Sequence, residues 1–267
     1  MSSPNSGVKL LLKKLEVSFR KHGPDHFIFQ SEGMRNTAVT GRGIPKSRTS
    51  VVKTGIDTEQ FAPDPNKRFY AHDSFDIPRD RRIIVFSGHM ERRKGVHVIL
   101  QAASSLIHRI KRRDVHFLIL GNRAGELESF SEYLNDDAVS AHVTFGGYRS
   151  DVADLLKSCS IGMIASTEWD SFPMSSLEMA SSALPLLVSD LPGLNEAVTP
   201  LTGMKFPVGD HEAAADAVDK FLSAPHKLLE YGQNGRQRVL KEYCQESQAR
   251  GILSVFRTLE QNLEKVS

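Results

Sequence analysis

Short, almost wholly apolar runs recur along this chain, and most of them are followed by a stretch with helical periodicity. The runs lie at residues 27–31, 50–53, 82–88, 115–121, 142–147, 161–166 and 184–190. An apolar run of this length without polar alternation predicts a strand buried on both faces, as in a parallel sheet covered by helices. The helical patterns between the runs lie at residues 95–111, 126–134, 151–157 and 175–182. The sequence therefore predicts an α/β fold with a Rossmann-like parallel sheet flanked by helices.

Two further segments lack apolar runs of this kind. Residues 211–263 have an all-helical pattern, so C-terminal helices are expected to close off the sheet. Residues 57–82 contain three prolines and many charges without a clear period, which favours a linker.

Composition excludes several classes of protein. Lys and Arg number 34 against 32 Asp and Glu, a formal charge of +2, which is too small for a general nucleic-acid binder. The two cysteines, Cys159 and Cys244, lie far apart without metal-ligand spacing, so neither a disulfide framework nor a metal site is predicted. We expect a protein of a reducing compartment, the cytoplasm.

The segment 8–22 mixes leucines with lysines in an amphipathic pattern. A surface helix packed through its apolar side is the favoured interpretation, because apolar stripes on helices usually face a core. The alternative is peripheral contact with an anionic membrane at its cytoplasmic face. No apolar stretch is long enough to span a membrane, and no signal peptide is predicted.

The loops after the strands are the expected place for a ligand, because ligands of open α/β sheets bind beyond the carboxyl ends of the strands. The loop at residues 88–95 begins with Gly88, which permits close approach of a backbone, and carries His89 and Lys94 around two arginines. Such a loop suits a diphosphate, with a merely solvated loop as the alternative. Neither GxGxxG nor GxxxxGK[ST] occurs, so a nicotinamide enzyme or a P-loop ATPase is not supported.

A second loop, after residues 161–166, carries two carboxylates. Asp170 precedes Pro173, which favours a helix start, and Glu178 lies inside that helix. Both carboxylates can face one crevice, where they would accept hydrogen bonds from sugar or ribose hydroxyls. On spacing alone, a helix cap at Asp170 and a solvated Glu178 remain the alternative.

The order of several motifs resembles that of a known family. The chain resembles the C-terminal, donor-binding half of the GT-B retaining glycosyltransferases of family 4, the glycosyl transferases group 1. The motifs that carry this resemblance are SEGMRN, VVKTGIDTEQF, FSGHMERRKGVHVIL, FLILGN, VTFGGYRSDVADLL, IASTEWDSFPMSSLEMASSALPLLVSDLPGLNEAV and TGMKFPVGD.

The resemblance implies roles for the phosphate-binding and sugar-binding residues. Lys94 matches the lysine that binds the donor diphosphate, whereas His89 stands where the family has arginine, with Arg92 or Arg93 as compensating cations. Asp170 matches the carboxylate that contacts the transferred sugar, although the family usually has glutamate there, and Glu168 is the alternative.

The resemblance also implies contacts to the nucleoside. Glu178 matches the carboxylate that holds the ribose hydroxyls, and neither carboxylate is expected to act as a general base. The main chain at Arg149 matches the stretch that meets the base. In the family, a stretch of main chain surrounds the sugar and the phosphate, and it is matched here by Ser171, Phe172, Pro173 and Met174.

The resemblance divides the chain into parts. Residues 1–50 resemble the end of an N-terminal GT-B domain with its hinge, residues 51–244 the nucleotide-sugar-binding domain, and residues 245–267 the helix that crosses back. A full enzyme takes its acceptor site from the N-terminal domain. The expected partner is therefore a separate N-terminal half or a second copy of this chain.

The implied activity is transfer of a sugar from a nucleotide-diphosphate sugar, with retention of configuration, in polysaccharide or glycolipid biosynthesis. No cofactor and no metal are expected. Two alternatives remain: a non-catalytic module that binds a nucleotide sugar, motivated by His89 and Asp170, and a GT-B epimerase that acts on the donor alone.

Overall fold

A computed structural model describes residues 7–19, 23–170 and 172–264 of the chain. The chain forms two compact units. The smaller unit contains residues up to Ile56 and residues from Lys241 onward, and the larger unit comprises residues 57–240. The assignment of residues 1–50, 51–244 and 245–267 to parts of a glycosyltransferase stays a prediction.

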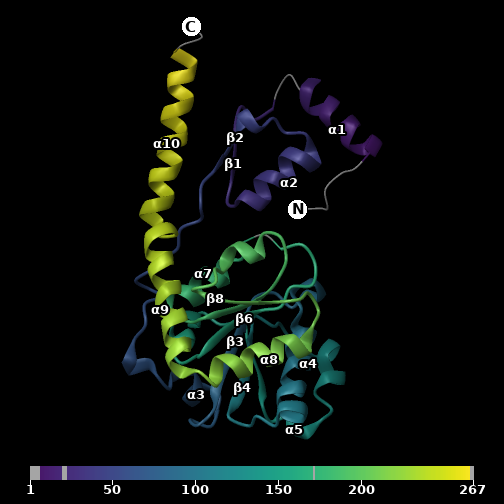
Figure 1. Ribbon diagram of the computed structural model, residues 1–267, viewed down its shortest axis with the longest axis vertical. Coiled ribbons are helices and arrows are strands. Elements are labelled where there is room, and N and C mark those ends of the chain that lie inside the picture. Colours follow the sequence, from purple (N-terminus) through teal and green to yellow (C-terminus); the bar gives the residue numbers. More distant parts are fainter. Residues whose placement is uncertain (1–6, 20–22, 171, 265–267) are drawn as a thin grey trace. The chain divides into compact units, whose positions relative to one another are not determined.

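The larger unit is built on a six-stranded sheet in which every neighbouring pair is parallel, as predicted from the apolar runs (Figure 1). The strand order is β5-β4-β3-β6-β7-β8. The strands are β3 (Arg82–Ser87), β4 (Val115–Leu120), β5 (Val143–Gly147), β6 (Ile161–Ile164), β7 (Leu186–Ser189) and β8 (Gly203–Phe206).

Helices α4 (Val96–Ser105) and α8 (His211–Leu222) pack against each other and against one face of this sheet. Every residue of β4 is buried, and so are all four residues of β6 and of β7. Phe117 and Phe221, from sheet and helix, are among the largest side chains in the resulting core. Burial on both faces explains why these strands lack polar alternation.

The remaining helices of the larger unit are α3 (Tyr70–Ser74), α5 (Asp137–Ser140), α6 (Val152–Leu156), α7 (Met174–Ser181) and α9 (Pro225–Glu242). Of these, α5, α6 and α7 connect strands of the sheet, whereas α3 precedes β3 and α9 follows α8. Two of the predicted helices are altered. The segment Glu126–Tyr133 is a 3-10 helix, and α4 continues as a π-helical turn over Leu106–Ile110.

Two parts of the sheet region differ from the sequence prediction. The segment predicted as a linker is ordered, because α3 buries Ala71 and Ile77 follows it into the core, and Ser158 Oγ accepts the Ala71 N–H at 2.9 Å. Strand β8 is absent from the predicted strands. It is short and lies at the edge of the sheet, where Lys205 leaves an exposed side chain that breaks the apolar pattern.

The smaller unit contains α1 (Gly7–Phe19), β1 (Phe27–Phe29), α2 (Glu32–Arg42), β2 (Thr49–Val51) and α10 (Gln245–Glu264). Strands β1 and β2 pair in parallel. Ser31 caps α2, since its Oγ accepts the Met34 N–H at 3.2 Å, and Gly43 ends the helix with a φ of 73°.

Helix α1 contacts α2, but much of its apolar side is exposed. Leu11, Leu12 and Leu15 are 60%, 60% and 47% exposed, so the favoured interpretation of a helix packed through its apolar side is wrong for these three leucines. Residues 20–22 of the segment lie outside the described residues. On α10, Leu253 and Phe256 are likewise more than half exposed. None of the described helices has the length and apolar character needed to cross a membrane.

A buried histidine lies at the start of β4. The side chain of His116 is enclosed between Arg81 and the neighbouring strand: Arg81 Nη1 donates to Nδ1 at 3.3 Å, and Nε2 donates to Thr144 Oγ1 at 2.8 Å. Both contacts suit a neutral imidazole. Burial, reinforced by the charge of Arg81, lowers the pKa of His116 from its ordinary 6.5 to about 3.

We expect this histidine to make stability depend on pH. A depressed pKa in the folded state means that the stabilisation is complete above pH 6.5 and is lost as pH falls from 6.5 toward about 3. At about 1.4 kcal/mol per pH unit, His116 destabilises the fold by about 2 kcal/mol between pH 7 and pH 5. In urea unfolding, His116→Gln should lose correspondingly less unfolding free energy between pH 7 and pH 5. Substitution of the exposed His226 on α9, His226→Gln, should leave the loss as in wild type. Equal losses in wild type and His116→Gln would contradict this assignment.

Candidate functional site

The candidate site lies where β3 and β6 lie side by side. The chain passes from β3 to β4 on one side and from β6 to β7 on the other, so the strand order reverses direction between β3 and β6. In open parallel sheets such a switch point leaves a crevice beyond the carboxyl ends of the strands. The loops at 88–95 and 165–173, predicted to carry the chemistry, leave these two strands.

The two loops touch through their backbones. A Cβ atom on Gly95 would lie 1.8 Å from the carbonyl oxygen of Ala165, and Gly95 has a φ of 71°, so only glycine fits there. The Thr167 N–H donates to the Arg93 carbonyl at 2.8 Å. These contacts fix the distance between the two loops.

The paired loops hold a buried ion pair. Lys94 Nζ lies 2.9 Å from both carboxylate oxygens of Asp170, whose side chain is only 3% exposed. Ser166 Oγ donates to Asp170 Oδ2 at 2.7 Å, and Arg93 Nη1 lies 3.8 Å from Oδ1. A buried carboxylate needs such partners, and Asp170 finds them in Lys94 and Ser166 beside the crevice.

Ser166 is a site residue that sequence reasoning missed. Its carbonyl accepts a hydrogen bond from Ser189 Oγ at 2.6 Å, so it links the end of β6 to β7 while its own hydroxyl orients Asp170. Its only sequence signal is a serine at the carboxyl end of a buried strand.

Helix α7 supplies the second carboxylate. Pro173 stands at its N-cap position and Met174 is the first helical residue, as predicted. Glu178 lies inside the helix, and its side-chain oxygens have no hydrogen-bond or ion-pair partner among the described residues. Burial raises the pKa of Glu178 above the usual range of glutamate. An unpaired, partly buried carboxylate of this kind can accept hydrogen bonds from a ligand's hydroxyl groups.

The stretch between the two carboxylates is described in part. Phe172 is buried, Met174 is 43% exposed, and Ser176 Oγ donates to the Pro173 carbonyl at 2.6 Å. Ser171, a predicted contact of the donor, lies outside the described residues.

The other predicted residues line a cavity of about 240 Å³ beside the ends of β3, β4 and β5. Gly88, His89 and Arg149 all contribute to its wall. Gly88 is tightly placed, since a Cβ atom on Gly121 would lie 2.1 Å from its carbonyl oxygen. The guanidinium of Arg149 is held by Asp151, with nitrogen to oxygen distances of 2.8 and 2.6 Å.

The structure thus separates the predicted residues into two groups. Lys94 and Asp170 bind each other at the switch point, whereas Gly88, His89 and Arg149 surround the neighbouring cavity. Sequence reasoning missed Tyr148, which is 80% exposed and lines this cavity. The neighbouring loops are joined by Asn122, whose Oδ1 accepts the Gly147 N–H at 2.8 Å. Tyr148 was detectable as the aromatic residue of the GGYRSD motif.

No group of three or more His, Cys, Asp or Glu side chains among the described residues is arranged to hold a metal ion. The Cys159 thiol is not activated, because burial raises its pKa.

Comparison with known proteins gives the family. The profile of "Glycosyl transferases group 1" matches residues 68–238, which include both loops of the site. The chain belongs to the glycosyl transferases group 1.

Curated relatives in this family are longer than the chain. The chain is 28% identical over 225 residues to D-inositol 3-phosphate glycosyltransferase of Corynebacterium urealyticum, which covers 80% of the chain and 52% of the relative. It is 24% identical over 217 residues to the lipopolysaccharide core biosynthesis mannosyltransferase LpsB of Rhizobium meliloti, covering 79% of the chain and 61% of that protein. The chain therefore spans about half the length of the curated relatives it matches.

Solved glycosyltransferase structures share the fold. A glycosyltransferase of Rickettsia africae superimposes with a TM-score of 0.86 at 20% identity, over 97% of this chain and 69% of that one. HepE of Anabaena, solved with UDP-glucose, gives a TM-score of 0.79 at 15% identity, over 94% of this chain and 68% of that one. The predicted GT-B architecture is thus confirmed at the level of the fold.

The ion pair of the candidate site should matter for stability. We expect Lys94→Met to cost about 3 to 5 kcal/mol, because it leaves the Asp170 carboxylate buried without its cation. The double variant Lys94→Met with Asp170→Leu should recover most of that loss. Urea unfolding checks both, with the exposed Lys227→Met on α9 as the matched control. A Lys94→Met variant as stable as wild type would contradict the buried pair.

Proposed function

We propose that this chain is the nucleotide-sugar-binding half of a retaining glycosyltransferase of family 4. On this proposal it transfers a hexosyl group from a nucleotide-diphosphate sugar to an acceptor whose site an N-terminal half completes. The observation that carries the proposal is the buried pair of Lys94 and Asp170 at the switch point of the sheet, followed by helix α7, which carries Glu178. The UDP-glucose bound to HepE supports a donor of this class.

The proposed roles follow from the contacts of each group. Lys94 has three N–H donors, and the two that face Asp170 leave one for a diphosphate oxygen. Glu178, which has no partner among the described residues, accepts hydrogen bonds from the ribose hydroxyls. Asp170 contacts the transferred sugar through the edge of its carboxylate, and the base enters the cavity beside Gly88 and Arg149.

In transfer, the bond between the anomeric carbon and the diphosphate oxygen breaks, and its electron pair leaves with the diphosphate. The oxygen of an acceptor hydroxyl forms the new bond to the anomeric carbon, and its proton passes to the departing diphosphate. Lys94 and the free N–H groups at the start of α7 would offset the charge that develops there. His89 adds a hydrogen-bond donor at the cavity wall. The chain contributes by positioning and electrostatics, which are the terms that dominate transfers of this kind. The proposal needs no cofactor and no metal.

Nucleotide binding tests the proposal directly. We expect calorimetric titration with UDP, GDP and ADP to show saturable binding of one of them. Lys94→Ala and Glu178→Gln should each weaken that binding about 10- to 100-fold, as expected for loss of one hydrogen bond to a charged group. Glu230→Gln, an exposed glutamate on α9, is the matched control. Absence of binding by all three nucleotides, or unchanged affinity in both variants, would contradict the proposal.

A donor assay separates transfer from binding alone. The chain is incubated with UDP-glucose, release of UDP is followed, and the anomer of the sugar product is read at once by proton NMR. Release of UDP together with formation of the α-anomer of the sugar product supports a retaining transferase. Nucleotide binding without release would support the alternative of a non-catalytic module, for which His89 in place of an arginine is the motivating residue.

We also propose that α1 contacts a membrane peripherally at the cytoplasmic face. Its exposed leucines alternate with lysines such as Lys9 and Lys14, a pattern suited to an anionic lipid surface. In flotation with vesicles containing phosphatidylserine at low salt, the chain should float, and Leu11→Ser with Leu12→Ser should not. Leu229→Ser on α9, a leucine 55% exposed, is the control. A wild-type chain that stays at the bottom of the gradient would end this part of the proposal.

A further inference from the structure

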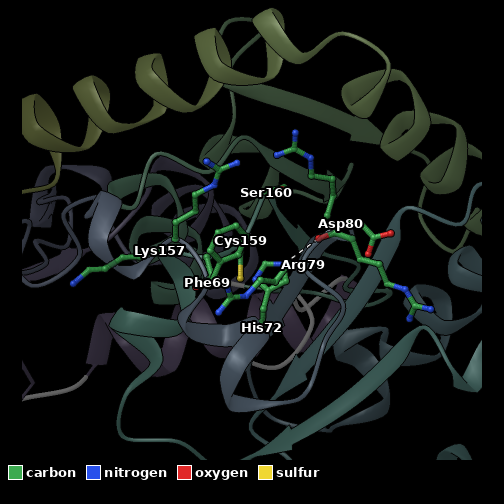
Figure 2. Close-up of a pocket in the computed structure, with 11 residues that line it drawn as sticks. Phe69, His72, Arg79, Asp80, Lys157, Cys159 and Ser160 are labelled. Carbon is green, nitrogen blue, oxygen red and sulfur yellow. Dashed lines mark hydrogen bonds between the residues drawn. The ribbon is translucent and has the colours of Figure 1, made fainter.

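A second cavity, of about 280 Å³, lies at the amino-terminal edge of the six-stranded sheet. Arg82, the first residue of β3, and Ser160, the residue before β6, are both in its wall, next to residues from α3 and from the end of α6 (Figure 2). Because the strands are parallel, this edge is opposite the carboxyl ends where the candidate donor site lies. The cavity is therefore separate from that site.

The lining of this cavity is strongly basic. Its cationic residues are Arg68, Arg79, Arg81, Arg82 and Lys157. The only acidic residue among the described residues that line it is Asp80. Arg79 is paired with Asp73 and Lys157 with Asp154, two aspartates that do not line the cavity. The cavity still keeps an excess of positive charge that an anion would neutralise.

Two of the arginines have no counter-ion among the described residues. The side chains of Arg82 and Arg68 make no hydrogen bond and no ion pair with any residue that the structure describes. Arg68 instead lies over the ring of Phe69, 5.1 Å from its centroid, and Arg79 lies over the same ring at 4.7 Å. Phe69 thus contacts two guanidinium groups, of which Arg79 is balanced by Asp73. Like charges gathered in this way favour a bound anion.

A buried polar atom at the same cavity has no hydrogen-bond partner in the part of the chain that the structure describes. His72, a wall residue only 5% exposed, donates from Nε2 to the carbonyl of Arg81 at 3.0 Å (Figure 2). A carbonyl can only accept, so in the neutral imidazole Nδ1 is the acceptor. Nδ1 is buried and has no hydrogen-bond partner in the described part of the chain. Buried acceptors are normally satisfied, so a hydroxyl group brought by a ligand would fill this need.

We propose that this cavity binds a small phosphate that carries a hydroxyl group, either inorganic phosphate or a hydroxylated phosphate monoester. Arginine forks match phosphate oxygens, and Arg82 and Arg68 are free to supply them. The P–OH of hydrogen phosphate, or a hydroxyl of a monoester, donates to His72 Nδ1. The volume of about 280 Å³ suits a small ligand rather than a nucleotide sugar.

Titration of the full chain with inorganic phosphate and with glycerol phosphate, at pH 8 and low salt, tests the proposal. We expect a saturable heat of binding with at least one of the two probes. The probe that binds more tightly shows whether the ligand is inorganic phosphate or a phosphate monoester. Arg82→Gln should weaken binding about tenfold or more, because it removes a charged donor without breaking any contact to the described residues. Arg257→Gln, an exposed arginine on α10, should bind as wild type. No saturable heat with either probe, or unchanged affinity in Arg82→Gln, overturns the proposal.

Sulfate isolates the role of His72. It has the charge and shape of phosphate but no proton to donate at pH 8, so wild type should bind it more weakly than phosphate. His72→Gln should abolish that difference, since the amide can still donate to the Arg81 carbonyl while Nδ1 is lost. Equal affinity of wild type for sulfate and phosphate overturns the role given to His72. Nucleotide binding by Arg82→Gln, measured in parallel, should stay at the wild-type level.

Discussion

The backbone contact between Gly95 and Ala165 governs the geometry of the candidate site. With a φ of 71° and no room for a side chain, Gly95 lets the loop after β3 lie directly against the end of β6. Lys94, the preceding residue, is thereby brought within 2.9 Å of Asp170. A larger residue at position 95 would separate the loops and leave a carboxylate buried without its cation, which is far more costly than loss of an exposed ion pair.

The two ends of the sheet are built for different purposes from the same strands. At the carboxyl ends, Lys94 is compensated by Asp170, and the group without a partner among the described residues is a carboxylate, Glu178. At the amino ends the balance is reversed, since Arg82 and Arg68 lack counter-ions among the described residues. One end is thus suited to the hydroxyl groups of a sugar nucleotide, and the other to a small anion.

Much of the fold was predictable because burial on both faces leaves an uninterrupted apolar run. The apolar runs predict β3, β4, β6 and β7 within a few residues on this basis. They do not predict β8, because an edge strand with Lys205 exposed has no such run. The linker prediction failed for a related reason: α3 is only five residues long, too short to show a helical period. The leucines of α1 carry a clear period, yet the smaller unit leaves them exposed.

The sequence by itself determined the order of strands and helices, the residue types in each loop and, through its motifs, the family. The family motifs singled out Lys94, Asp170 and Glu178, because charged side chains after buried strands stand out in a linear pattern. Only the tertiary structure decided that Lys94 and Asp170 bind each other while Glu178 has no partner among the described residues. The basic cavity was equally invisible in the sequence, since the pairing of β3 with β6 brings Arg82 near Lys157, and the packing of α3 against α6 adds Arg68. Contacts between residues that far apart depend on how strands are ordered in space, which no local pattern encodes.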